Sequence, residues 1–162
     1  MMFPINIGNS VDRPNDEGDR PLVKVELDFS RLTILIVDDQ DYVRSIVVQL
    51  LRSLGVGKVV EGASGDVAIQ ILETTKADLI LCDIKMKPMD GLQFLREVRS
   101  GKGQIDSQVP IIFLTAASDQ TTVQEAITLG IDGYMVKPVS GSILKEKITT
   151  VMQKRMAKAA SW

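Results

Sequence analysis

Residues 33–55 read TILIVDDQDYVRSIVVQLLRSLG, and this stretch decides the fold. Its first five residues are apolar or β-branched, which is typical of a strand buried on both faces. Two aspartates follow, and apolar residues then recur at i, i+3, i+4, i+7, i+8 and i+11, the spacing of an amphipathic helix that ends at Gly55. The stretch therefore predicts a strand and a helix joined by an acidic turn.

The same order of strand and helix repeats along the chain. Runs typical of strands are Thr33–Val37, Lys58–Glu61, Asp78–Cys82, Pro110–Leu114 and Gly133–Val136. Amphipathic stretches predict helices at about 43–54, 64–74, 90–98, 119–129 and 140–152. Parallel strands need crossover connections, and these are right-handed. The pattern therefore predicts an α/β protein, a three-layer doubly wound fold whose five-stranded parallel sheet has helices on both faces.

Composition limits the chemistry that this chain can perform. It has 162 residues, 44% of them hydrophobic and 25% charged, and a net charge of −2, as expected of one globular domain with short extensions. It has no histidine and one cysteine, which excludes Ser-His-Asp catalysis, His-ligated metals and an internal disulfide. The charge argues against a nucleic-acid binder. No apolar run is long enough for a membrane span, so we expect a cytoplasmic protein.

Charged and hydroxyl side chains follow the predicted strands where each one ends. Asp38 and Asp39 follow the first strand, Asp83 the third, Thr115 the fourth and Lys137 the fifth. Because the functional crevice of such a sheet lies at the carboxyl ends of its strands, we expect these groups to converge. Clustered carboxylates suit Mg²⁺, and a phosphoryl group could sit between that ion and the lysine. A carboxylate can act as the nucleophile in phosphoryl transfer.

Four motifs at these strand ends resemble those of the receiver domains of bacterial response regulators in two-component systems, such as the single-domain chemotaxis regulator. They read ILIVDDQDYVRSIV, LILCDIKMKPMDG, IIFLTAAS and GYMVKP, and the resemblance covers residues 31–155. It implies a flavodoxin-like sheet with strand order 2-1-3-4-5. It also implies a protein that takes a phosphoryl group from a sensor histidine kinase or a phosphotransfer protein and signals to a downstream protein partner.

The resemblance also implies a role for each residue at the strand ends. Asp83 is the phosphoacceptor, and Lys137, in a cis bond to the following proline, pairs with the phosphoryl group. Thr115 supplies a hydroxyl that turns toward the phosphoryl group, and Tyr134 is the switch aromatic, buried in one state and exposed in the other. The implied ligands of Mg²⁺ are Asp38, Asp39, Asp83 and the backbone carbonyl of Lys85.

Two positions depart from the pattern of this family. The proline of the loop after the acceptor stands one place late, at Pro88, so we expect a different path for this loop. Position 85 is often Asn or another small or neutral residue in the family, and here it is Lys85. We hypothesise that Lys85 alters the lifetime of the aspartyl phosphate or pairs with the acidic cluster.

Residues outside 31–155 form two short extensions. Residues 1–30 are expected to be partly disordered, with an alternating pattern at 22–29 that predicts an extra strand or a dimerising arm. Residues 156–162 form a short basic tail. Neither is long enough for an output domain, so we expect output through protein contact or onward phosphotransfer. A homodimer could form through the N-terminal arm or through the face of the fourth and fifth helices.

We expect a phosphoacceptor that loses its phosphate slowly and is not a turnover enzyme. Other interpretations of the sequence stay open. The main one is a phosphorylation-independent, receiver-like scaffold for protein interaction. A metal-dependent phosphotransferase or phosphatase of the haloacid-dehalogenase type would need an aspartate at position 85, where this chain has lysine. A flavin-binding electron carrier would need a phosphate-binding loop after the first strand, where Asp38 and Asp39 would repel the flavin phosphate.

Overall fold

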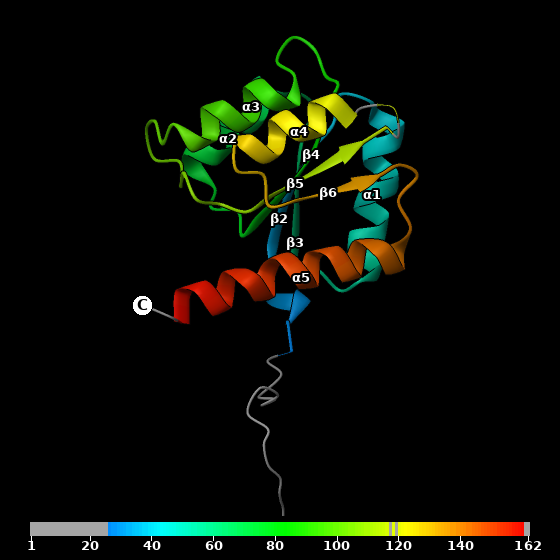
Figure 1. Ribbon diagram of the computed structural model, residues 1–162. Helices are drawn as coiled ribbons and strands as arrows, with labels where there is room; N and C mark the ends of the chain where they lie inside the picture. The colour runs from blue at the N-terminus through cyan, green and yellow to red at the C-terminus, as the bar shows by residue number, and fades with distance from the viewer. Residues whose placement is uncertain (1–25, 117, 119, 161–162) are drawn as a thin grey trace, which may run out of the picture.

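A five-stranded parallel sheet forms the centre of the fold in the computed structural model, which describes residues 26–116, 118 and 120–160 (Figure 1). The strand order is β3-β2-β4-β5-β6, and every neighbouring pair is parallel. In chain order this is 2-1-3-4-5, so the predicted flavodoxin-like topology is confirmed. The strands are β2 (Thr33–Val37), β3 (Lys58–Gly62), β4 (Leu79–Asp83), β5 (Ile111–Thr115) and β6 (Gly133–Val136).

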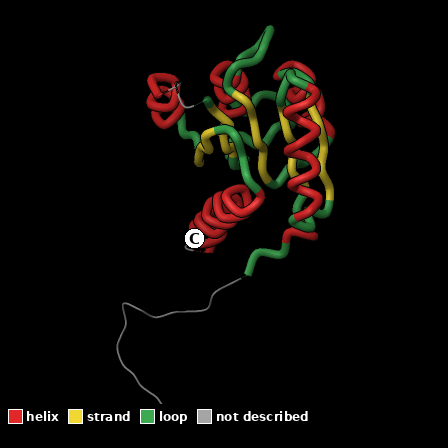
Figure 2. Tube along the Cα trace, turned by 90° about the vertical axis from the view of Figure 1, so that its right-hand side faces the viewer, coloured by secondary structure: helices red, strands yellow, loops and turns green. Residues whose placement is uncertain are grey.

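Helices cover both faces of this sheet in the described part of the chain. They are α1 (Asp41–Ser53), α2 (Gly65–Thr74), α3 (Gly91–Arg99), α4 (Gln120–Thr128) and α5 (Gly141–Ala160). Figure 1 shows α2, α3 and α4 together on one side, with α1 and α5 on the other, and Figure 2 shows the strands between helices. The predicted three layers are confirmed. None of the described helices is long and apolar enough to span a bilayer.

Two apolar layers, one on each face of the sheet, hold the helices in place. Successive residues of β2 alternate between them, since Ile34 and Ile36 pack with α1 and α5 while Leu35 and Val37 pack with α2 and α3. All four side chains are at most 1% exposed. A strand buried on both faces needs apolar residues at every position, which explains the unbroken run TILIV.

Three strands end one residue later than the sequence predicted, and two of them, β4 and β5, end at candidate site residues. Asp83 pairs in register with Leu114, and Thr115 pairs with Val136, so Asp83 and Thr115 are the last residues of β4 and β5 rather than the first residues of loops. Both polar side chains are buried, with exposed fractions of 6% and 1%. The sheet itself therefore fixes the position of two candidate site residues.

The N-terminal extension differs from its prediction. A strand was predicted at residues 22–29, of which 22–25 lie outside the described residues. For the described residues this prediction is wrong, because 26–28 are irregular and Phe29–Arg31 form a 3-10 turn. The carboxylate of Asp28 accepts the N–H of Ser30 at 3.0 Å and so caps the turn. The carbonyl of Phe29 then accepts the N–H of Gly57 at 3.0 Å, which ties the extension to the start of β3.

The last helix continues into the segment that the sequence assigns to a short basic tail. Residues 156–160 belong to α5, which continues without a break from Gly141 to Ala160, while residues 161–162 lie outside the described residues. The N-terminal boundary of α3 was predicted correctly. Asp90 accepts the N–H of Gln93 at 2.9 Å and the Gln93 side chain accepts the N–H of Asp90 at 2.9 Å, which is a complete capping box.

Candidate functional site

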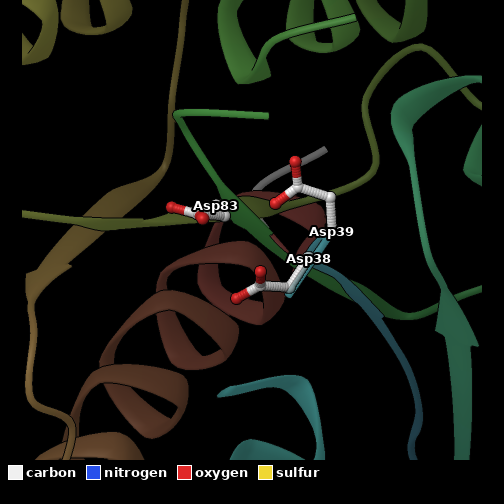
Figure 3. A group of neighbouring side chains, drawn as sticks. All are labelled: Asp38, Asp39 and Asp83. Carbon is white, nitrogen blue, oxygen red and sulfur yellow. The ribbon is translucent and has the colours of Figure 1, made fainter. Parts of the chain in front are cut away.

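Three carboxylates meet at the carboxyl ends of two neighbouring strands (Figure 3). Asp38 and Asp39 directly follow β2, and Asp83 ends β4, which pairs with β2. One oxygen of each lies within 4.8 Å of the others. Asp38 is fully buried and Asp83 nearly so, while Asp39 is exposed at the rim. The strand ends therefore bring together three groups that the sequence places at two positions 45 residues apart.

Backbone groups hold two of these carboxylates in place. Oδ1 of Asp38 accepts the N–H of Gln40 at 2.9 Å, and Oδ2 of Asp39 accepts the N–H of Lys87 at 3.2 Å. Arg44 on α1 donates to the backbone carbonyl of Asp38 at 2.7 Å. The roles of Arg44 and Lys87 could not be predicted from the sequence, because backbone contacts of this kind leave no signature in residue type.

Lys137 and Thr115 complete the same edge of the sheet. Nζ of Lys137 lies 3.1 Å from Oδ1 of Asp83 and 3.9 Å from Oδ2 of Asp38. The backbone N–H of Lys137 donates to the carbonyl of Thr115 at 2.8 Å, and the Lys137–Pro138 bond is cis, as the resemblance implied. The hydroxyl of Thr115 donates to the carbonyl of Ala116 at 3.0 Å.

The electrostatics of the cluster are unfavourable for three ionised carboxylates. Burial raises the pKa of Asp38, with a further rise from the neighbouring Asp83, although the hydrogen bond from Gln40 opposes it. Burial also raises the pKa of Asp83, although Lys137 lowers it in part. The ammonium group of Lys137 offsets only part of the negative charge, so the cluster favours binding of a further cation.

The donor set fits a hard divalent cation such as Mg²⁺. Oδ2 of Asp38 is buried and accepts no hydrogen bond within the described part of the protein. A buried carboxylate oxygen without a partner is costly, and a metal ion would remove this cost. Carboxylate oxygens are the ligands that Mg²⁺ prefers, and it commonly uses only one or two of them with waters. Asp38, Asp39 and Asp83 are the residues that would hold it.

Comparison with known proteins identifies the family. A model of the response regulator receiver domain matches residues 34–149, most of the chain. The chain belongs to the response regulator receiver family. It is 34% identical over 123 residues to the chemotaxis protein CheY of Pseudomonas aeruginosa, an alignment that covers 76% of this chain and 98% of that protein. The predicted membership is confirmed.

Solved receiver structures have the same fold. The structure of the chemotaxis protein CheY4 of Vibrio cholerae superposes with a TM-score of 0.68 at 28% identity, covering 74% of this chain and 98% of that one. The receiver domain of a sensor histidine kinase from Pseudomonas aeruginosa superposes with a TM-score of 0.63 at 31% identity, covering 71% and 92%. That second structure has a magnesium ion coordinated in its active-site cleft.

Tyr134 and Thr115 of this receiver border one cavity. Tyr134 lies in β6 and is 42% exposed, and the cavity of about 320 Å³ between β5, α4 and β6 is lined by both side chains. Lys85 lies in the loop after β4, where it is exposed and lines a separate cleft of about 510 Å³ together with Asp39 and Lys87. The structure thus places Thr115 beside Tyr134 and Lys85 beside the acidic cluster.

The loop between β4 and α3 depends on a glycine whose role was not predicted from the sequence. Gly91 begins α3, and a Cβ there would lie 2.7 Å from the carbonyl oxygen of Asp83 and 2.7 Å from Cα of Ile84. The N–H of Gly91 donates to the carbonyl of Ile84 at 2.6 Å. Only glycine permits this close approach of α3 to the end of β4. The motif MDG contains the signal, which is a glycine directly after a helix N-cap.

Proposed function

We propose that this receiver accepts a phosphoryl group on Asp83, with Mg²⁺ held by Asp38, Asp39 and Asp83, and signals to a protein partner. One observation carries the proposal, namely that Asp83 lies within 4.8 Å of two other carboxylates and 3.1 Å from Nζ of Lys137. A nucleophile, a cation-binding pair and a fixed ammonium group are the components that phosphoryl transfer needs.

The donor in this proposal is a phosphohistidine of a sensor histidine kinase or a phosphotransfer protein. The chain has no histidine, so the phosphoryl-carrying imidazole must belong to the partner. A carboxylate oxygen of Asp83 attacks the phosphorus and forms a P–O bond. The P–N bond of the phosphohistidine breaks, and the imidazole leaves with its electron pair. When bound, Mg²⁺ neutralises charge on the phosphoryl oxygens.

The chain's own residues position and stabilise the group that is transferred. The ammonium group of Lys137 pairs with Asp83 in this structure and is placed to contact an oxygen of a phosphoryl group bound there. Charge-assisted hydrogen bonds of this kind are strong in a partly buried site. The N–H groups of Gln40 and Lys87 orient Asp38 and Asp39. We propose the backbone carbonyl of Lys85 as a further ligand of the cation.

Output in this proposal uses Thr115 and Tyr134. The hydroxyl of Thr115 exchanges the carbonyl of Ala116 for a phosphoryl oxygen, and the side chain of Tyr134 moves into the cavity that it shares with Thr115. This changes the surface formed by α4, β6 and α5. The protein acts stoichiometrically, since Asp83 keeps the phosphoryl group until it is hydrolysed, and we propose that it works in the cytoplasm.

Incubation with acetyl phosphate and Mg²⁺, followed by intact mass spectrometry, tests the proposal. We expect a phosphate-sized gain in mass that requires Mg²⁺ and is absent in Asp83→Asn. Asp106→Asn is the matched control, because it removes an exposed carboxylate from the loop between α3 and β5, away from the carboxylate cluster, and should be phosphorylated like the wild type. No gain with acetyl phosphate or with a phosphorylated histidine kinase would contradict the proposal and favour the phosphorylation-independent scaffold.

A further inference from the structure

A second charged cleft lies at the opposite end of the sheet from the carboxylates. It has a volume of about 440 Å³ and is lined by residues of α3, the loops before β5 and β6, and the last turns of α5. Asp132, which directly precedes β6, marks its position, because its N–H donates to the carbonyl of Ile111 at 3.0 Å and Ile111 is the first residue of β5. The cleft therefore lies at the amino ends of β5 and β6.

Asp132 is the only carboxylate among the described residues of the lining, and it is already engaged. Oδ2 of Asp132 accepts the N–H of Ile111 at 2.8 Å and Nη2 of Arg99 at 2.9 Å. Its other oxygen, Oδ1, lies 3.4 Å from Nη2 of Arg155. Two guanidinium groups thus share one carboxylate, which offsets only one of their two charges.

Arg99 forms a fixed wall of the cleft. Its Nη1 donates to the carbonyls of Ser107 and Val109 at 3.0 and 2.8 Å, and its Nη2 also donates to the carbonyl of Gly130 at 3.2 Å. Burial lowers the pKa of Arg99, and the nearby Arg155 lowers it further, although Asp132 and, less strongly, Asp106 oppose both. The positive charge at this wall is therefore rigidly placed.

Two lysines on α5 add to this charge. Lys154 and Lys158 line the same cleft one turn apart, so the described residues of the lining carry four cationic side chains and one carboxylate, a net charge of +3. Among the described residues Lys154 has no ion-pair or hydrogen-bond partner. Four cations that converge on one concavity repel one another, and a bound anion relieves that repulsion.

We propose that this cleft binds a small, multiply charged phosphate-bearing solute. Guanidinium and ammonium groups together are the side chains that proteins use for phosphate recognition, and the volume falls within the range of small-molecule sites. Leu129 and Val151 supply an apolar wall for an uncharged part of the ligand. All four cations line one cleft, which favours a compact solute over a nucleic acid or a membrane. This site goes beyond the proposed phosphoacceptor function.

Calorimetric titration with inorganic pyrophosphate, at constant ionic strength and with EDTA present to remove divalent cations, tests the proposal on the full chain. We expect saturable binding with one site. The double variant Lys154→Gln/Lys158→Gln should bind about tenfold more weakly or worse, which corresponds to the loss of two charged contacts. The control Lys58→Gln/Lys145→Gln changes the net charge equally at exposed positions outside the cleft and should bind like the wild type.

Asp83→Asn should bind pyrophosphate with wild-type affinity, which separates this site from the phosphoacceptor. Thermal unfolding of each variant checks that it is folded, and both double variants change only solvent-facing lysines of the described chain. Absence of saturable binding to the wild type would overturn the proposal. Equal weakening in the two double variants would also overturn it, because binding would then follow net charge rather than the cleft.

Discussion

Nζ of Lys137 lies 3.1 Å from Oδ1 of Asp83, although Lys137 follows β6, Asp83 ends β4, and β5 lies between these two strands. The lysine side chain therefore crosses the end of a whole strand to reach the carboxylate. It is 27% exposed, so solvent screens the pair only in part. Because the contact links β4 to β6, any group added to Asp83 must displace Lys137 or engage it.

Substitution of Lys137 tests this link. We expect Lys137→Met to lower the initial rate of phosphorylation by acetyl phosphate about 10-fold to 100-fold, because an apolar side chain of similar length cannot stabilise charge on the transferred group. The rate is measured by intact mass at several times under saturating Mg²⁺. Lys145→Met, an exposed position on α5, should have no effect. A rate for Lys137→Met equal to that of the wild type would argue against a role for Lys137 in the transfer step.

Substitution of Asp38 tests the electrostatic cost of the cluster. The folded pKa of Asp38 lies above its ordinary value of 3.8, so the folded protein binds protons more tightly and its stability falls as pH rises through the window above 3.8. The cost is fully present once the pH lies above the folded pKa. Asp38→Asn should therefore raise the melting temperature of the metal-free protein at pH 7, by about 3 °C for each kcal/mol recovered.

The same variant should respond differently to pH and to Mg²⁺. The stabilisation by Asp38→Asn should shrink as the pH falls through the raised pKa of Asp38, because the wild-type carboxyl then takes up a proton. Excess Mg²⁺ should stabilise the wild type, by linkage to binding, and stabilise Asp38→Asn much less. Asp66→Asn, which removes an exposed carboxylate from the first turn of α2, serves as the control. A variant that is less stable than the wild type at pH 7 without metal would contradict the electrostatic account.

Much of this site could be predicted because the sequence shows approximately where each buried strand ends. The run TILIV followed by two aspartates indicates a buried strand and its carboxyl end, and parallel topology then brings Asp38, Asp83 and Lys137 to one edge. The last residue of each strand was harder to predict. Asp83 and Thr115 are the last residues of their strands because backbone pairing continues past the apolar run, and hydropathy does not report backbone pairing.

Other features depend on contacts between distant segments. The alternation at 22–29 resembles a strand, but Asp28 caps a local turn and the carbonyl of Phe29 bonds to Gly57, so local capping and a tertiary contact override the pattern. The second charged cleft, at the amino ends of β5 and β6, could not be predicted either. Arg99 and Arg155 become neighbours only through their shared partner Asp132. Sequence periodicity carries no information on such pairings.

Gly91 offers a test of the packing beneath the acceptor. We expect Gly91→Ala to destabilise the protein by about 1–3 kcal/mol, the usual cost of overpacking, because its Cβ would lie 2.7 Å from the carbonyl oxygen of Asp83. Urea denaturation measures the change in the free energy of unfolding. Gly141→Ala is the matched control, since it also starts a helix and its Cβ would meet only Leu50 at 3.7 Å. Equal stabilities for the two variants would show that the backbone near Gly91 adjusts freely.

Lys85 is expected to control the lifetime of the phosphorylated state. It lines the cleft beside Asp39, and we expect its long side chain to restrict the approach of water to Asp83. We expect Lys85→Asn to shorten the half-life of the aspartyl phosphate about threefold or more, because a shorter amide opens this approach and can orient water. Loss of the phosphate-sized mass gain after removal of the donor gives the half-life. Lys102→Asn, on the loop after α3, is the control, and equal half-lives for Lys85→Asn and the wild type would refute the expectation.

Tyr134 and Thr115 should report the conformational switch together. The chain has two tyrosines, so fluorotyrosine labelling gives two ¹⁹F signals, and Tyr42 on α1, which is 79% exposed, serves as an internal control. We expect phosphorylation to reduce the solvent isotope shift of Tyr134, now 42% exposed, and to leave that of Tyr42 unchanged. In Thr115→Ala we expect Asp83 still to be phosphorylated and Tyr134 to stay exposed. The variant has no hydroxyl at position 115 that could move out of the shared cavity to bond the phosphoryl group. A Tyr134 signal that is indifferent to phosphorylation in the wild type would mean that output takes another route.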